Sequence, residues 1–326
     1  MQIRKITSLI DKLDAKLVVL LCHHNADPDA IGAAFAFDNL LKQLRPNLKT
    51  EIGAAAGPSK LSKAVIKAVN VELTDQPQIE NADLVVLLDT NTTQQLDDWA
   101  ALLQPAQPIL LIDHHAPHPE TEHISALSVT DETASSTCEI VYRLFKEAKI
   151  KPSVASAKAL FLGIAFDSRH FILAGSETLK IVAELAQIVN PRETLPILSL
   201  PMDYSERVAR LKTAGRMKIV KVNNWLIALS RLSTFQASAA RGLVAFGAHV
   251  AIVAGEKDGG IQVSFRASHE FFTETGIHMG RDLATPLGEF LGGMGGGHSV
   301  SAGANGNGDV NGCLNFCEKL IKQKLS

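Results

Sequence analysis

Short, continuously apolar runs alternate with segments of helical spacing through roughly the first 190 residues of the chain. The runs over 16–22, 82–88 and 108–112 are bounded by polar or turn residues, which is typical of strands covered on both faces. Apolar residues at three- and four-residue spacing predict helices over 59–69, 93–103, 136–148 and 153–164. This alternation predicts an α/β fold whose N-terminal part is a doubly wound, mainly parallel sheet.

The remaining third of the chain predicts a second, smaller α/β domain. A helical stretch over 191–216 is broken by Pro191, Pro196 and Pro201, as expected of an interdomain linker. Beyond it, the pattern predicts strands over 217–222, 225–232, 249–255 and 261–266, and helices over 237–246, 281–291 and 310–325. A chain of 326 residues exceeds the size at which one core keeps growing. We therefore expect domains over 1–190 and 217–326, with the active site in the cleft between them.

Metal-binding side chains follow each of the three apolar runs in the first domain. His23, Asp27 and Asp29 come after the first run, Asp89 after the second, and the segment 113–115, Asp-His-His, after the third. Because the carboxyl ends of parallel strands meet at one edge of a sheet, we expect these side chains to converge. Taken alone, each of these residues has a simpler explanation than metal binding. A single His is more often a surface residue, and Asp29 could cap the following helix. The conjunction of three strand ends favours a metal site.

The spacing within the first segment indicates two metal ions rather than one. Asp27 and Asp29 are separated by Pro28, so their carboxylates point in different directions and one can serve each ion. A pair of ions roughly 3.5–4 Å apart also needs a bridging carboxylate, which Asp89 can supply. Mixed histidine and carboxylate ligands favour Mn²⁺ over Mg²⁺ and over structural zinc.

These segments resemble the motifs of the DHH phosphoesterase superfamily, in the family's order and over nearly the whole chain. Asp113-His114-His115 matches the motif that names the family, and 23–29 matches its first motif with Ala26 and Pro28 in place of Pro and Gly. Further matches are Asp89, the Ser-Ser-Thr segment within 134–142, Gly-Ile-Ala-Phe-Asp at 163–167, and Gly-Gly-Gly-His at 295–298, which resembles the DHH-associated C-terminal domain. The two-domain size is similar to the branch of oligoribonucleases and 3′-phosphoadenosine-5′-phosphate (pAp) phosphatases.

The resemblance implies a ligand set for each of two metal ions. One ion would be held by His23, Asp27 and Asp89, and the other by Asp29, Asp89, His114 and Asp167. His115 would be catalytic and face the substrate, with Asp113 orienting a neighbouring histidine or the loop; His24 stays ambiguous.

The second domain offers groups suited to phosphate. The glycine-rich run over 292–298 would let backbone N–H groups approach an anion, although such a run alone is more often a flexible turn. Arg266 presents a planar fork of donors, unless it is a solvated edge charge. We expect Gly296, Gly297, His298 and Arg266 to bind the substrate.

Composition limits the substrate. A net charge of −2, a pI near 6.6 and few aromatic residues argue against long nucleic acid held on a basic or stacking surface. We expect two-metal activation of water to hydrolyse short oligonucleotides or 3′,5′-bisphosphate nucleotides. The alternatives are a RecJ-like single-strand exonuclease, a cyclic or linear dinucleotide phosphodiesterase and, outside enzymes, a nucleotide-binding partner protein.

The sequence also bears on location and assembly. No long apolar run or signal-peptide layout is present, and the four cysteines form no CxxC pair, so we expect a cytoplasmic protein without a membrane partner. The oligomeric state is open, a homodimer included.

Overall fold

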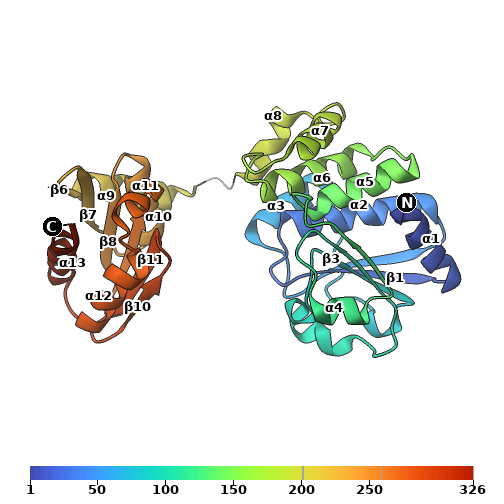
Figure 1. Ribbon diagram of the computed structural model, residues 1–326, viewed down its shortest axis with the longest axis horizontal. Coiled ribbons are helices and arrows are strands. Elements are labelled where there is room, and N and C mark those ends of the chain that lie inside the picture. Colours follow the sequence, from blue (N-terminus) through green and yellow to red (C-terminus); the bar gives the residue numbers. More distant parts are fainter. Residues whose placement is uncertain (200–201, 258, 326) are drawn as a thin grey trace. The chain divides into compact units, whose positions relative to one another are not determined.

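The computed structural model describes residues 1–199, 202–257 and 259–325, which fall into two compact units (Figure 1). Unit 1 comprises 1–200 and unit 2 comprises 201–326. The helical linker predicted over 191–216 is divided between them. Its first part, α8 (Pro191–Thr194) and the 3₁₀ turn η3 (Leu195–Leu198), belongs to unit 1, and its last part, α9 (Tyr204–Arg216), belongs to unit 2. Positions 200, 201, 258 and 326 of the predicted linker and second domain lie outside the described residues.

Unit 1 contains a five-stranded, entirely parallel sheet in the order β2-β1-β3-β4-β5. The three predicted strands are confirmed as β1 (Leu17–Cys22), β3 (Leu84–Leu88) and β4 (Ile109–Asp113), which are adjacent in the sheet. The edge strands β2 (Lys49–Ala54) and β5 (Leu127–Thr130) were not predicted, because their partial exposure leaves no continuous apolar run.

Helices and 3₁₀ turns cover both faces of this sheet. One face packs against α1 (Gln2–Lys12), α2 (Pro28–Leu44), α3 (Lys60–Val69), α5 (Thr137–Ala148) and α6 (Val154–Asp167). The other face packs against η1 (Ile79–Asn81) and η2 (Thr93–Leu102). The helix expected over 93–103 is therefore a 3₁₀ segment, with a non-helical kink at Asp97. The short α4 (Pro119–Ile124) and α7 (Ser176–Leu185) complete unit 1.

Unit 2 contains a six-stranded mixed sheet in the order β10-β11-β9-β8-β7-β6. The predicted strands are confirmed as β6 (Lys218–Val222), β7 (Trp225–Arg231), β8 (Val250–Lys257) and β9 (Gly260–Ala267). One face packs against α11 (His269–Thr275), the π-helical turn η4 (Met279–Ala284), α12 (Thr285–Phe290) and α13 (Val310–Leu325). The other packs against α9 and α10 (Gln236–Ala245).

The glycine-rich run is a strand in the structure, not a flexible turn. Its residues form β10 (Met294–Gly297), which pairs antiparallel with β11 (Ser301–Gly306), and the N–H of His298 donates to the carbonyl of Ser301 at 2.7 Å to close the hairpin. A Cβ on Gly295 would lie 1.7 Å from the carbonyl oxygen of Ala284, and one on Gly297 would lie 2.6 Å from the Cα of Ala302. Packing therefore explains two glycines of the run.

Candidate metal centre

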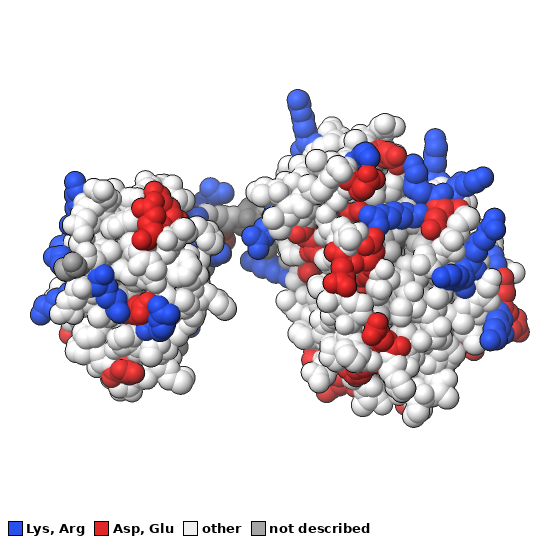
Figure 2. Space-filling view, viewed as in Figure 1, with Lys and Arg blue, Asp and Glu red and all other residues white. Residues whose placement is uncertain are grey.

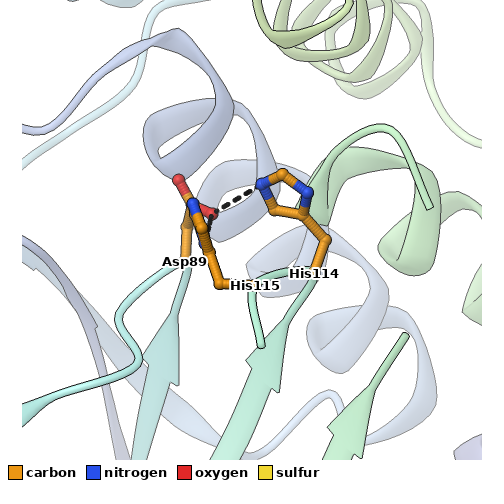
Figure 3. Close-up of side chains that lie close together, drawn as sticks. All are labelled: Asp89, His114 and His115. Atoms are coloured by element: carbon orange, nitrogen blue, oxygen red, sulfur yellow. Dashed lines mark ion pairs between the residues drawn. The ribbon is translucent and has the colours of Figure 1, made fainter. Parts of the chain in front are cut away.

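Three adjacent strands of unit 1 end at one cluster of histidines and aspartates. Asp89 follows β3, His114 follows β4, and the two side chains point toward one another (Figure 3). His114 Nε2 lies 3.5 Å from Asp89 Oδ1. From the neighbouring β1, His23 Nε2 lies 3.7 Å from the other oxygen of the same carboxylate, Asp89 Oδ2. His114 and His23 therefore approach opposite oxygens of the Asp89 carboxylate.

The first group of possible ligands is His23, Asp27 and Asp89, whose donor atoms lie within 4.8 Å of one another. His23 Nδ1 is 2.8 Å from the carbonyl oxygen of His24. Because a carbonyl can only accept, Nδ1 carries the proton and Nε2 keeps its lone pair for a cation. Asp27 is the N-cap of α2, since its Oδ1 accepts from the N–H groups of Asp29 and Ala30. Its Oδ2 lies 3.9 Å from His23 Nε2.

The second group is Asp29, His114 and Asp167. His114 Nε2 lies 3.1 Å from Asp167 Oδ2, yet this buried nitrogen has no well-directed hydrogen bond. Asp29 is completely buried, and its two oxygens accept from the N–H groups of Thr137 at 2.6 Å and Cys138 at 2.9 Å. Asp29 thus binds the N-terminus of α5, a segment more than a hundred residues away, and the cap of its own helix is Asp27.

The N-terminus of α5 also holds the carboxylate of Asp89. The hydroxyl of Thr137 donates to Asp89 Oδ1 at 2.9 Å, and both residues are buried. The backbone of Asp89 is left-handed, with φ 54°, a conformation that non-glycine residues adopt mainly where the surroundings enforce it. The N-terminus of α5 therefore holds one carboxylate of each group.

His115 and Asp113 form a pair beside this cluster. Asp113 Oδ1 accepts from the backbone N–H of His115 and lies 2.8 Å from its Nδ1. His115 Nδ1 is also 3.5 Å from Asp89 Oδ1, while half of the side chain remains exposed. Asp113 is fully buried and its Oδ2 has no hydrogen-bond partner among the described residues. His24 instead lies against η2, with Nδ1 3.2 Å from the carbonyl oxygen of Gln95.

The protonation of the cluster favours a cation. Burial, followed by repulsion from neighbouring carboxylates, raises the pKa of Asp29 well above its usual range and that of Asp89 to about 8. Burial lowers the pKa of His114. The hydrogen bond to Asp167 and the negative charge of Asp89 have the larger combined effect and raise the pKa to about 9. Crowded carboxylates and a buried histidine nitrogen without a directed hydrogen bond are the donor set that a divalent cation would satisfy. The residues present fit a metal ion.

The predicted substrate residues lie close together at one end of β9 and β11. Arg266 pairs with Ser301 across these strands, and Ser301 closes the turn that begins at His298. Arg266 uses one guanidinium nitrogen on the carbonyl of Phe265, and burial followed by repulsion from Arg241 lowers its pKa. The side chain of His298 is exposed, and of the predicted glycines Gly296 faces open space.

Comparison with known proteins decides the family. Residues 17–164 match the model of the DHH family, N-terminal domain. An uncharacterized protein of Methanocaldococcus jannaschii, MJ0988, is 35% identical over 320 residues, which cover 98% of this chain and 94% of that protein. The chain belongs to the DHH family.

Three other similarities are more distant. The bifunctional oligoribonuclease and PAP phosphatase NrnA of Bacillus subtilis is 26% identical over 64% of this chain and 61% of NrnA. A Streptococcus pyogenes protein named "Probable manganese-dependent inorganic pyrophosphatase" is 29% identical over 52% of the chain and 56% of that protein. A solved exopolyphosphatase-related protein from Bacteroides fragilis superposes with a TM-score of 0.64 at 20% identity, covering 99% of this chain and 95% of that one. This last likeness supports the DHH fold alone.

Sequence reasoning missed the part played by Thr137 in this DHH-family site. The Ser-Ser-Thr segment resembles a family motif, but nothing in its spacing predicts a hydrogen bond to Asp89. The sequence offered no signal for it, because the burial of Ser136, Thr137 and Glu139 at the start of α5 is seen only in the structure. A buried polar residue at a helix start implies a buried partner.

Proposed function

We propose that this protein hydrolyses short oligonucleotides or 3′,5′-bisphosphate nucleotides, using two divalent cations, with Mn²⁺ the favoured ion. Membership of the DHH family makes the chain a hydrolase that acts on phosphate esters, and the proposal concerns which ester and which ions. The observation that carries it is the position of the Asp89 carboxylate, which has His23 3.7 Å from one oxygen and His114 3.5 Å from the other, at adjacent strand ends. The similarity to NrnA supports the substrate class, and that to the pyrophosphatase supports manganese.

The proposed ligands divide as the family resemblance implies. His23, Asp27 and Asp89 would hold one ion, and Asp29, Asp89, His114 and Asp167 the other. Two ions in such a site lower the pKa of a bound water and neutralise charge on phosphoryl oxygens. The protein itself contributes a prepared set of lone pairs, because α2 holds Asp27, α5 holds Asp29 and Thr137 holds Asp89.

His115 is proposed to act on the substrate directly. Its hydrogen bond to Asp113 raises its pKa, because a carboxylate at 2.8 Å favours the charged imidazolium. With Nδ1 held by Asp113, Nε2–H is free to donate to a phosphoryl or departing oxygen. Asp113 therefore positions His115 and holds its proton.

Unit 2 is proposed to recognise phosphate. Arg266 and His298 bring donors to one end of the β9–β11 pair, a surface that suits a short anionic ligand. On the face drawn in Figure 2, Lys and Arg are scattered among uncharged and acidic side chains and form no continuous basic track. No described helix is long and apolar enough to cross a membrane. The placement of the active site between the two domains stays a prediction, as do a cytoplasmic location and the oligomeric state.

A substrate panel tests the proposal. Metal-stripped protein is loaded with Mn²⁺, Mg²⁺ or Zn²⁺, and the rate of hydrolysis is measured on each substrate. The substrates are adenosine 3′,5′-bisphosphate, oligonucleotides of two to five nucleotides, strands of tens of nucleotides, and cyclic and linear dinucleotides. We expect the highest rate with Mn²⁺ on the bisphosphate or the short oligonucleotides. Processive degradation of long strands with little action on dinucleotides would favour the RecJ-like alternative. Tight nucleotide binding with no product would favour a binding protein.

A further inference from the structure

Three successive residues after α6 have left-handed backbones, and none of them is glycine. The φ angles are 51° at Arg169, 56° at His170 and 70° at Phe171. Residues with a side chain adopt this conformation rarely, mostly one at a time and at a cost in free energy, whereas glycine adopts it without strain. Such strain persists where the surroundings enforce it, and it is often found at functional sites. A run of three therefore calls for a reason to keep each side chain.

The surroundings hold this turn in place. Ser168 is buried, and its hydroxyl donates to the carbonyl of Ile164 at 2.5 Å and accepts from the N–H of Phe171 at 3.1 Å. The carbonyl of Ser168 also accepts from the N–H of Leu173 at 2.9 Å. The ring of Phe171 packs edge-on against Phe161 of α6, with ring centroids 5.5 Å apart. Packing thus explains why position 171 carries a side chain.

The side chain of Arg169 has no such explanation within the described part of the chain. It is exposed, and its guanidinium makes no hydrogen bond or ion pair with a described residue, Asp167 included. Asp167, the last residue of α6 and a proposed metal ligand, is only two positions earlier. Two residues of chain span at most roughly 7 Å, so the backbone of Arg169 lies at the rim of the metal centre. A guanidinium there is available to a ligand.

We propose that Arg169 binds a phosphate of the substrate other than the one that is cleaved. The inference rests on the proposed function, in which the cleaved phosphate lies at the two ions. A guanidinium presents a planar, permanently charged fork of donors that matches two phosphate oxygens. A reach of roughly 7 Å from Asp167 is similar to the separation of the 3′- and 5′-phosphates across one ribose. Both substrate classes proposed above, bisphosphate nucleotides and short oligonucleotides, carry such a second phosphate.

Unit 1 would then select its substrates by the number of their phosphates. Arg169 favours an ester that carries a second phosphate over a simple monophosphate ester, and it does so without any residue of unit 2. The competing explanation is that Arg169 only stabilises the C-terminus of α6, where the helix dipole favours a cation. That role needs a positive charge at the helix end but no ligand, so it predicts a change in melting temperature and none in binding.

Calorimetry on the Mn²⁺-loaded full chain tests this. The parent protein and all variants carry His115→Ala, which should slow hydrolysis without removing a proposed metal ligand, so that binding can be measured. The ligands are adenosine 3′,5′-bisphosphate and adenosine 5′-monophosphate, which lacks the second phosphate. Arg169→Gly should weaken binding of the bisphosphate about 10- to 100-fold, the effect of losing hydrogen bonds between charged groups, and binding of the monophosphate less than about threefold. Arg169→Lys keeps the charge without the fork, so its loss should be smaller.

Lys149 provides a matched control. It is also basic, exposed and left-handed, with φ 57°, and it follows the C-terminus of α5, the end of that helix opposite to the one that holds Asp29. Lys149→Gly removes the same charge from a helix end and should leave both affinities unchanged. Both glycine variants should melt within a few degrees of the parent protein, because glycine relieves the strain at a positive φ.

The proposal is overturned if Arg169→Gly binds the bisphosphate as tightly as the parent protein, or if it weakens both ligands equally. It is overturned as well if Lys149→Gly loses as much affinity, or if Arg169→Gly changes only the melting temperature. Failure of the proposed function has a different signature, since the wild-type protein would then hydrolyse no substrate of the panel. An Arg169-dependent preference for the bisphosphate would in that case still support the phosphate site, and its absence would overturn it.

Discussion

Replacing Thr137 with valine should weaken metal binding while leaving the fold intact. Valine has nearly the same shape as threonine and keeps the backbone N–H that Asp29 accepts at 2.6 Å, but it lacks the hydroxyl that donates to Asp89 Oδ1 at 2.9 Å. Asp89 is buried among other carboxylates, and its pKa is already raised to about 8. Loss of a donor to its charged form raises that pKa further, so protons compete more strongly with the cation.

The expected loss of Mn²⁺ affinity follows from the hydrogen bond between Thr137 and Asp89. A hydrogen bond to a charged group is worth about 1.5–3 kcal/mol, and removal of a group that orients a metal ligand costs roughly 10- to 100-fold in affinity. Titration of metal-stripped protein with Mn²⁺ near neutral pH, followed by calorimetry, measures it. The loss should shrink as the pH is raised from 8 toward and beyond the higher pKa of Asp89 in the variant, because Asp89 then becomes ionised in both proteins. A purely structural role for Thr137 would not produce that dependence on pH.

Two variants control the experiment. Thr137→Ser keeps the hydroxyl and should bind Mn²⁺ within about threefold of the wild-type protein. Thr121 is equally buried, but its hydroxyl donates to the carbonyl of Asn91, outside the ligand groups, so Thr121→Val should leave metal affinity unchanged. Thr137→Val binding Mn²⁺ as tightly as the wild-type protein would refute the reasoning, and so would an equal loss in Thr121→Val.

Further predictions concern the ions, the substrate and pH. Asp89→Ala should abolish activity and reduce both ions, and two ions per chain by plasma emission would remove the bridging assignment. Asp27→Asn keeps the N-cap of α2, so metal content should fall toward one ion with the melting temperature within a few degrees of wild type. Arg266→Ala and His298→Ala should keep both ions yet lower turnover of nucleotides more than that of an aryl phosphodiester, and equal losses would make them structural. For the metal-free protein, the raised pKa of Asp89 gives a contribution to stability that is full below about pH 4 and lost as the pH rises through about 8. Its melting temperature should therefore fall over that range, and Mn²⁺ should restore it; a flat profile would contradict the raised pKa.

The strands that could be predicted from the sequence are those buried on both faces of the sheet. The runs at β1, β3 and β4 are fully or almost fully buried, so no polar residue interrupts them and their ends stand out. Edge strands such as β2 lack that signal, because exposed positions such as Lys49 break the apolar run. The hairpin of β10 and β11 was missed for another reason, since glycine has a low strand propensity and only its neighbours hold it in the sheet.

The convergence of the candidate ligands could also be predicted, but their supports could not. Parallel strands bring His23, Asp89 and His114 together by topology, whichever residues surround them. The partner of Asp29 is set by tertiary packing of α5 against α2, which local spacing does not encode. The cap of α2 was also not predictable from local spacing. The sequence suggested Asp29, but the backbone geometry makes Asp27 the N-cap.

The bonds from Asp29 to the start of α5 join positions 108 and 109 residues apart, which has a consequence for how the protein acquires metal. Contacts of such high contact order form late, because the loop they close is long and its entropy is lost before they gain anything. The carboxylates of Asp29 and Asp89 are held only once α5 has docked, so a complete set of ligands would exist only in the folded chain. A metal ion that binds this set and not the unfolded chain would stabilise the native state. If these contacts form after the folding transition state, it would act mainly by slowing unfolding, and the native chain would then survive longer against proteases.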